Sequence, residues 1–252
     1  MLKVENLEFS YNKNVPVLRG ADLRLEQGQV GILLGKNGCG KTTLFKNILN
    51  IEKPQGGTIT LDGTDLMKMP RKNRARYIAY VPQHIHFGDL TVFDSVLMGR
   101  VSYFGMKAGR EDYEAVEKIL EDMGLTEFAT RSAEELSGGE KQKIAIARAM
   151  AQEPKLMVFD EPTGNLDMAN EQLIMQEARK LAKTKGISIL SSLHDLNQAL
   201  YFGDRFFLMQ DGKVKYAGGK EIITPEVIRD IFDVDVQILE MDGQPVVLNN
   251  FR

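Results

Sequence analysis

Gly35-Lys36-Asn37-Gly38-Cys39-Gly40-Lys41-Thr42 is the stretch of sequence that decides the fold of this chain. It follows the apolar run Val30–Leu34, which is typical of a strand buried on both faces. A helix is expected to begin at Lys41 and to end near Leu49. Glycines at this spacing let the backbone curl so that several N–H groups face one anion, and the start of the helix adds positive dipole character. The stretch therefore predicts a phosphate-binding loop between a strand and a helix.

The residue types of this loop match the P-loop pattern G-x-x-x-x-G-K-[ST]. Lys41 is expected to reach the β- and γ-phosphates of a nucleotide, and Thr42 to offer its hydroxyl to Mg²⁺. Cys39 occupies a variable position, so we expect a small tolerated residue there rather than a catalytic thiol. A plain glycine-rich turn is the alternative, and the Lys-Thr pair with correct flanks argues against it.

A second element ends in two carboxylates: Lys155-Leu156-Met157-Val158-Phe159-Asp160-Glu161 is an apolar run of the Walker B type. The carboxyl end of a parallel strand is expected near the P-loop. Asp160 would hold Mg²⁺, directly or through water. Glu161 would orient or deprotonate an attacking water. The alternative is a strand followed by a solvated acidic turn.

The rest of the chain alternates strands with helices, which predicts a mostly parallel sheet. Near the N-terminus the apolar positions of Leu2–Phe9 change parity, so a bulge is expected near Glu5-Asn6. Residues 91–151 are predicted to be helical. The remaining expected strands are 21–26, 58–61, 77–81, 155–160, 187–192 and 205–210, and the expected helices are 168–184 and 194–202. At the end of the chain we expect a hairpin at Asp211-Gly212, a helix from Pro225 and a strand pair around Asp242-Gly243.

Composition narrows the class of protein. The 252 residues carry a formal net charge of −3, which argues against a nucleic-acid partner. A single cysteine, Cys39, cannot form an intrachain disulfide. The charged N-terminus lacks the apolar region of a signal peptide, and no apolar run approaches the length of a membrane helix. We therefore expect a soluble cytoplasmic protein whose membrane role, if it has one, depends on a partner.

A second helix start with anion-binding character lies at Leu136-Ser137-Gly138-Gly139-Glu140. Ser137 is a good N-cap for the Ala-rich helix that includes Ile144–Ala151, and the two glycines expose backbone N–H groups. This segment has neither a P-loop lysine nor a carboxylate pair of its own. The chain thus has one complete site, made of the P-loop and the carboxylate pair, and one half site, the helix start at Ser137. This indicates that the half site closes over the nucleotide of a second copy. An ordinary capped helix is the alternative.

The same five residues closely resemble the signature motif of ATP-binding-cassette (ABC) ATPases, and the other motifs occur in that family's order. The resemblance implies an α/β fold: a P-loop NTPase (RecA-like) core with a mostly parallel sheet, an N-terminal antiparallel β subdomain and a helical subdomain. It implies one domain over 1–252, with 1–87 and 152–252 as the core and 88–151 as the helical part. Two copies would pack head to tail and share two ATP. Ser137, Gly138 and Gly139 would contact the γ-phosphate held by the partner chain.

Four further positions take their roles from this resemblance. Tyr11 matches the aromatic residue that stacks on adenine, and Gln83 matches the glutamine that contacts Mg²⁺ and water. Asp167, in Asn165-Leu166-Asp167, matches the D-loop at the dimer interface, and His194 matches the switch histidine at the γ-phosphate. The implied catalytic residues are Lys41, Gln83, Glu161 and His194, and the implied Mg²⁺ ligands are Thr42, Gln83 and Asp160. The implied nucleotide-binding residues are Tyr11, Gly35, Asn37, Gly38, Cys39, Gly40, Lys41, Thr42, Thr43, Ser137, Gly138, Gly139 and Asp167.

Two departures from the family pattern, Glu140 for the commoner Gln and Leu193 for the frequent Thr, do not touch the proposed chemistry. ABC proteins of DNA repair carry a long coiled coil between P-loop and signature, whereas 95 residues separate Thr42 from Ser137 here. Ribosome-associated ABC factors carry two cassettes, and this chain has one. The resemblance thus favours a transporter subunit.

Thr91–Arg100 and Thr224–Ile228 resemble subunits that import iron chelates, haem or vitamin B12. An exporter or another substrate stays open. The implied partners are a second copy, a membrane permease and, indirectly, a periplasmic or surface substrate-binding protein, at the cytoplasmic face of the cell membrane. His84 and His86 could suggest a metal site, but no other ligand is near in sequence. By resemblance they lie near the permease contact.

Overall fold

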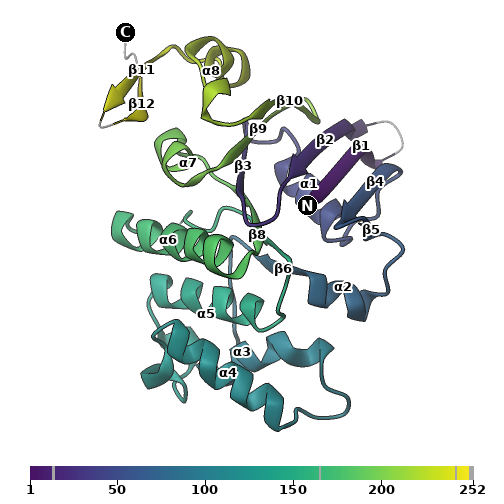
Figure 1. Cartoon of the computed structure of the whole chain (residues 1–252), viewed down its shortest axis with the longest axis vertical. Helices are drawn as coiled ribbons and strands as arrows, with labels where there is room; N and C mark the ends of the chain where they lie inside the picture. Colours follow the sequence, from purple (N-terminus) through teal and green to yellow (C-terminus); the bar gives the residue numbers. More distant parts are fainter. Residues whose placement is uncertain (13–14, 165, 242, 250–252) are drawn as a thin grey trace. The chain divides into compact units, whose positions relative to one another are not determined.

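The computed structural model describes residues 1–12, 15–164, 166–241 and 243–249. The chain forms two compact units, one made of Met1–Met69 and Ala178–Arg252 and the other of Pro70–Glu177. Each unit carries its own group of the predicted site residues, so each is described by itself (Figure 1).

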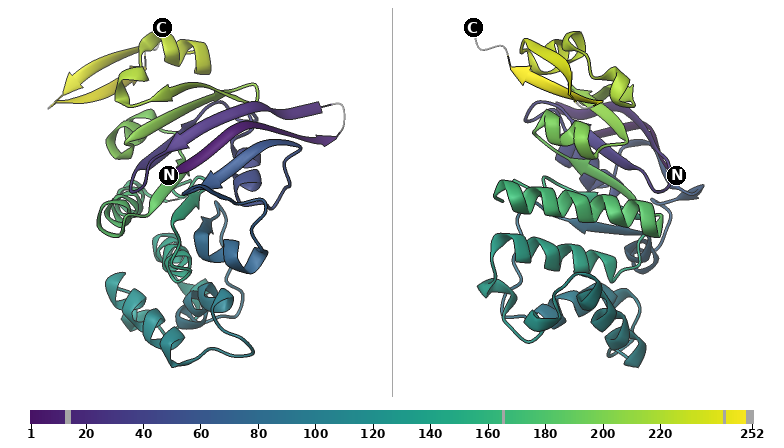
Figure 2. Two further views of the ribbon diagram at one scale, coloured as in Figure 1. Left: turned by 45° about the vertical axis from the view of Figure 1, so that its right-hand side comes forward. Right: turned by 60° about the vertical axis from the view of Figure 1, so that its left-hand side comes forward.

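An antiparallel sheet opens the first unit, with strand order β2-β1-β4-β5 (Figure 2, left). Its strands are β1 (Leu2–Asn12), β2 (Val15–Leu25), β4 (Gly56–Leu61) and β5 (Thr64–Asp65). The register of β1 shifts between Val4 and Leu7 against β2, and between Glu5 and Glu8 against β4. Asn6, inside the shift, has a φ of 47°. The predicted bulge is therefore confirmed, and it turns the apolar residues on both sides of it to the same core.

Parallel strands form the second sheet region of this unit. They are β3 (Val30–Leu34), β8 (Ser188–Ser192) and β9 (Arg205–Gln210), and β3 pairs with both of the others. All five residues of β3 are buried, as its continuous apolar run predicts. The helix α1 (Lys41–Ile48) follows β3, and α7 (Leu196–Phe202) follows β8.

The hairpin and the C-terminal elements agree with the sequence. The strand β10 (Lys213–Gly218) pairs antiparallel with β9 through a turn in which Asp211 and Gly212 have φ of 48° and 77°. The short helix η4 (Lys220–Ile222) leads to α8 (Pro225–Phe232), which Thr224 caps. The strands β11 (Val236–Met241) and β12 (Gln244–Asn249) pair antiparallel. Asp242, in the turn expected between them, lies outside the described residues.

The second unit packs helices beside a pair of parallel strands. β6 (Ile78–Val81) and β7 (Leu156–Phe159) run in register, with Val81 opposite Phe159. The helices are α2 (Arg71–Tyr77), α3 (Val92–Leu97), α4 (Arg110–Asp122) and α5 (Gly138–Met150), with short 3-10 helices η1 (Met98–Ser102), η2 (Thr126–Phe128) and η3 (Ala133–Glu135). The helix α6 (Met168–Lys185) begins here and ends in the first unit.

One element of the second unit was missed in the sequence. Tyr77, expected to start a strand, is instead the last residue of α2. This helix buries none of its residues and therefore has no apolar stripe to reveal it.

Both units bear out the predicted fold class, an α/β protein with parallel strands, an N-terminal antiparallel sheet and a helical part. The boundaries expected for the helical part, 88–151, stay a prediction. Among the described residues, no helix is both long and apolar enough to span a membrane.

Candidate functional site

The predicted phosphate loop joins β3 to α1 in the first unit. Gly35, Gly38 and Gly40 have φ of 153°, 80° and 110°, values that favour glycine. A side chain at Gly35 would also meet the Met209 carbonyl oxygen at 2.4 Å. Gly40 is the N-cap of α1 and provides no side-chain cap, so the N–H groups of the first turn have no side-chain acceptor at this cap. Such a helix start suits an anion.

Lys41 is buried within this loop, with 6% of the residue exposed. Its Nζ donates to the carbonyl oxygens of Gly35 at 2.7 Å and Lys36 at 3.2 Å. The loop therefore holds the ammonium group inside its own curve. The Cys39 carbonyl accepts from the N–H of Gly212 at 3.1 Å, so the turn between β9 and β10 supports the loop. Burial raises the pKa of the Cys39 thiol, although Lys41 opposes the shift, and a protonated thiol is a poor nucleophile.

Tyr11 lies beside the first turn of α1. Its hydroxyl is 3.4 Å from Thr43 Oγ1, and its ring packs edge-on against Phe9 with centroids 4.9 Å apart. About half of Tyr11 is exposed (52%), so the side chain is accessible to a ligand. Thr43 is buried, whereas Thr42 is exposed at the loop. The first unit therefore brings Tyr11 close to the first turn of α1, and its role in stacking on adenine stays a prediction.

His194 leaves the sheet at the same edge as the phosphate loop. In the parallel register of β3 and β8, Leu33 lies opposite Ser192. Gly35 and His194 each come two residues later, so both follow the carboxyl ends of neighbouring strands. His194 is exposed, and Asp195 caps the next helix by accepting from the N–H of Gln198 at 2.7 Å.

The two carboxylates lie in the second unit, at the end of β7. Asp160 is 6% exposed, and Tyr80 donates to its Oδ2 at 3.5 Å. Burial and the nearby Asp160 raise the pKa of Tyr80 to about 12. Glu161 has a φ of 49°, in the left-handed region that side chains rarely adopt. Its Oε2 accepts from Gln83 Nε2 at 2.6 Å. The structure thus places Gln83 in contact with Glu161, directly after Asp160, as expected for residues assigned to Mg²⁺ and to the attacking water.

The signature segment forms a capping box at the start of α5. Ser137 Oγ accepts from the N–H of Glu140 at 3.4 Å, and Glu140 Oε2 accepts from the N–H of Ser137 at 2.8 Å. The Ser137 hydroxyl also donates to Glu140 Oε2 at 2.6 Å, and this bond, with the smaller effect of the Ser137 N–H, lowers the pKa of Glu140. Glu140, which stands where the family more often has glutamine, therefore stabilises the start of α5 through this capping box. Ser137 and Gly138 are exposed, so this helix start is accessible.

Asn170, which the sequence analysis did not single out, links the signature segment to the D-loop. Its N–H and Nδ2 donate to the two carboxylate oxygens of Asp167, at 2.9 and 2.8 Å. A side chain at Gly139 would meet Asn170 Oδ1 at 2.3 Å, so Asn170 lies directly against the signature glycine. The spacing Asp-x-x-Asn at the start of a helix was the available signal. Asn165 of the same loop lies outside the described residues.

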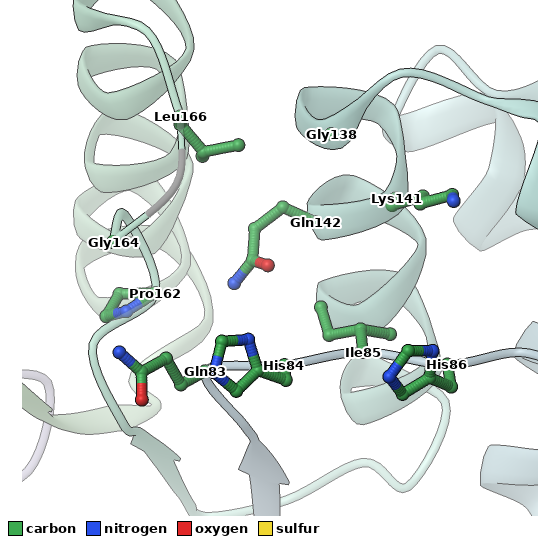
Figure 3. A pocket seen from close by; sticks show the side chains of 10 residues that line it. All are labelled: Gln83, His84, Ile85, His86, Gly138, Lys141, Gln142, Pro162, Gly164 and Leu166. Atoms are coloured by element: carbon green, nitrogen blue, oxygen red, sulfur yellow. The ribbon is translucent and has the colours of Figure 1, made fainter.

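A pocket of about 200 Å³ opens between these segments of the second unit (Figure 3). Its walls are the Gln83–His86 segment, the first turns of α5 and the loop that follows Glu161. The lining residues are Gln83, His84, Ile85, His86, Gly138, Lys141, Gln142, Pro162, Gly164 and Leu166.

Comparisons with known proteins agree with these motifs. A family model described as ABC transporter matches residues 18–164. An uncharacterized ABC transporter ATP-binding protein of Methanocaldococcus jannaschii is 39% identical over 98% of this chain and 97% of that protein. The iron(3+)-hydroxamate import ATP-binding protein of Bacillus subtilis is 34% identical over 94% and 90%. The ferric enterobactin transport ATP-binding protein of Escherichia coli is 33% identical over 98% and 93%.

Solved structures give the same result. A metal-chelate type ABC transporter in an inward-facing conformation superposes with a TM-score of 0.85 and 30% identity, over 99% of this chain and 97% of that one. A dimeric ATP-binding cassette bound to ADP and Pi gives a TM-score of 0.75 and 29% identity, over 87% and 98%.

Proposed function

Because this chain belongs to the ABC transporter family of ATP-binding proteins, we propose that it is the ATP-hydrolysing subunit of a metal-chelate importer. The cargo would be an iron–siderophore complex, haem or cobalamin, and a separate membrane permease would carry it. The observation behind this proposal is similarity along nearly the whole chain to proteins named for iron-chelate import and to a metal-chelate type transporter.

The phosphate loop is proposed to bind the nucleotide. The uncapped N–H groups at the start of α1 would face the phosphates, and the Lys41 ammonium would exchange its loop carbonyls for phosphate oxygens. Tyr11 would stack on the adenine. Asn37, Cys39 and Thr43 would contribute through the shape of the loop and the first turn of α1.

Mg²⁺ fits the oxygen groups of this chain. The Thr42 hydroxyl is exposed at the loop, Asp160 presents a buried carboxylate, and Gln83 has an exposed amide. Hard oxygen ligands of this kind are what Mg²⁺ prefers. When bound, the ion would neutralise part of the phosphate charge. Tyr80 would keep the Asp160 carboxylate in place through its hydroxyl.

Glu161 is proposed as the general base for the attacking water. Gln83 Nε2 donates to the Glu161 carboxylate at 2.6 Å, and this contact restrains the orientation of the carboxylate. His194 would position the water or the γ-phosphate from the sheet edge that it shares with the phosphate loop. Gln83 and His194 would act by orientation, since phosphoryl transfer depends mainly on positioning and on stabilisation of charge.

A second copy of this chain is proposed to complete the site head to tail, so that two copies share two ATP. Ser137, Gly138 and Gly139 would present the exposed start of α5 to the partner's γ-phosphate, and Asp167 would line the interface. A dimeric cassette bound to ADP and Pi supports dimerisation. The family relationship supports a permease partner and, indirectly, a substrate-binding protein. The chain would then lie at the cytoplasmic face of the membrane, with residues 88–151 as the helical subdomain that moves with the permease.

Transport in reconstituted vesicles tests the proposed function. The tagged chain would be purified from its own membranes with the permease that accompanies it, and the complex placed in proteoliposomes with its binding protein. ATP-dependent uptake of a ferric hydroxamate, haem or cobalamin, and none of a polyamine, is expected. Uptake of the polyamine alone, or release of chelate from loaded vesicles, would contradict the import of metal chelates.

A further inference from the structure

Gln142 carries a buried amide nitrogen, Nε2, that makes no hydrogen bond among the described residues. The residue is 5% exposed, and its Nε2 is closed off from solvent without an acceptor anywhere in the described part of the chain. Buried polar groups nearly always have a partner, because an unpaired buried donor destabilises the fold. Its retention here therefore needs a reason other than stability.

The position of Gln142 gives that reason. It lies on α5 four residues after Gly138, and both residues line the pocket beside the signature segment. In Figure 3 its amide points away from α5 and into the pocket, with Gln83 and Pro162 on the other side. The facing wall includes Gln83, Pro162 and Gly164, each of which carries a carbonyl oxygen that can accept a hydrogen bond.

The facing wall is connected to the proposed base. Gln83 donates to the Glu161 carboxylate at 2.6 Å, and the N–H of Gly164 donates to the Glu161 carbonyl at 3.2 Å. A side chain at Gly164 would lie 3.4 Å from Gln83 Nε2, so these residues form one packed group. A hydrogen bond from Gln142 to this wall would therefore fix Glu161 relative to the signature helix.

The neighbouring Lys141 cannot take this role. Its Nζ is bound to Glu134 Oε2 at 2.8 Å, and Glu134 Oε1 accepts from the N–H of Phe87 at 2.5 Å. Lys141 thus belongs to a completed contact on the rim of the pocket, while the amide of Gln142 is still available.

We propose that Gln142 is a positioning residue for ATP hydrolysis: during turnover its Nε2 donates to the wall formed by Gln83 and 162–164 and aligns Glu161 with the signature segment. This inference rests on the proposed role of Glu161. The inference predicts that removal of Nε2 lowers the rate of ATP hydrolysis without lowering the melting temperature. The reason is that the bond is missing in this structure and would form only as the pocket narrows during turnover.

The variant Gln142→Met tests the inference, since methionine keeps the length of the side chain and removes the donor. We expect kcat to fall about tenfold with KM for ATP unchanged. The melting temperature should stay the same or rise, because a buried unpaired donor has been removed. The matched control is Lys141→Met, which should lower the melting temperature and leave kcat within about twofold of wild type. A Gln142→Met protein with a lower melting temperature and wild-type kcat would show a merely structural role and overturn the inference.

A second arm measures coupling to the base. In a Glu161→Gln background, adding Gln142→Met should change the single-turnover rate by less than about twofold. The reason is that substitutions of residues that act as one unit do not have additive effects on the rate. A full additional tenfold loss would overturn the inference. Wild-type hydrolysis separates the two proposals: a wild-type chain without ATPase activity contradicts the proposed function, whereas normal wild-type activity with normal Gln142→Met kcat contradicts this inference alone.

Discussion

Gln83 and Glu161 are joined by a hydrogen bond of 2.6 Å between the amide Nε2 and the carboxylate Oε2. The register of the sheet explains the contact. Val81 lies opposite Phe159 in the parallel strands β6 and β7, and each of the two residues comes two positions later. The left-handed backbone of Glu161, with a φ of 49°, is the local cost of this arrangement.

Loss of this contact should impair catalysis more than binding. In Gln83→Ala the Glu161 carboxylate loses the hydrogen bond from Gln83 Nε2, so it samples more orientations. We expect kcat for ATP to fall about tenfold with KM within about twofold, because misplaced catalytic groups cost rate. Steady-state ATPase assays measure both. His84→Ala, which alters the next residue, is the matched control, and equal losses in the two variants would count against the role of the hydrogen bond.

Tyr11 should contribute to nucleotide affinity through its ring and not through its hydroxyl. The ring is half exposed beside α1, and its hydroxyl contact with Thr43 is long, at 3.4 Å. Tyr11→Ala is expected to weaken ATP binding by about tenfold, the range found for a stacked base, whereas Tyr11→Phe should bind within about twofold of wild type. Titration with a fluorescent ATP analogue measures both constants. An equal loss in the two variants would mean that the hydroxyl, and not stacking, matters.

The two signature glycines should tolerate a methyl group differently. A Cβ at Gly139 would lie 2.3 Å from Asn170 Oδ1, so alanine must displace Asn170 from Asp167. A Cβ at Gly138 would lie 3.4 Å from Leu166 Cδ2, an ordinary contact. We expect Gly139→Ala to lose about 1 kcal/mol of unfolding free energy, a typical value for one hydrogen bond. Gly138→Ala should lose less. Denaturant unfolding measures the unfolding free energy of both variants. If Gly138→Ala were the less stable of the two, the close contact between Gly139 and Asn170 would be contradicted.

Tyr80 should ionise only in strong alkali. Its pKa is about 12 because burial and Asp160 disfavour the phenolate. Since this pKa lies above the unfolded value of 10.0, Tyr80 contributes stability below about pH 10, and the contribution is lost as pH rises through 12. The difference in ultraviolet absorbance between wild type and Tyr80→Phe should show one phenol titrating near 12. Asp160→Asn should lower that value without returning it to 10.0, because burial is the larger cause. A Tyr80 that titrates near 10 would contradict this description of its surroundings.

The sequence predicted the elements whose patterns are local. The buried run of β3, the parity change that requires a bulge at Asn6, and the Asp211-Gly212 turn each carry a residue-level signal, and the structure has them. The exposed helix α2 carries no such signal, because it buries none of its residues.

For the site, the motifs predicted a set of candidate residues but not the contacts between them. That Gln83 binds Glu161, or that Asn170 joins Asp167 to the signature glycine, depends on strand register and on close packing between segments far apart in sequence. The unpaired amide of Gln142 is likewise a property of packing. The Asp-x-x-Asn spacing signals the bond between Asn170 and Asp167, but no local pattern in the sequence indicates the other contacts.

The central claim is that one copy supplies the base and the phosphate loop while a second copy supplies the signature segment. Light scattering after size-exclusion chromatography of Glu161→Gln, with and without ATP, tests it most directly. Hydrolysis should fall at least about a hundredfold, as expected on loss of a general base, while ATP binding is retained. The account predicts that ATP then converts a monomer into a stable dimer, and that Ser137→Arg in the same background abolishes the dimer. A Glu161→Gln chain that binds ATP yet stays monomeric, or a dimer that survives Ser137→Arg, would contradict the shared site.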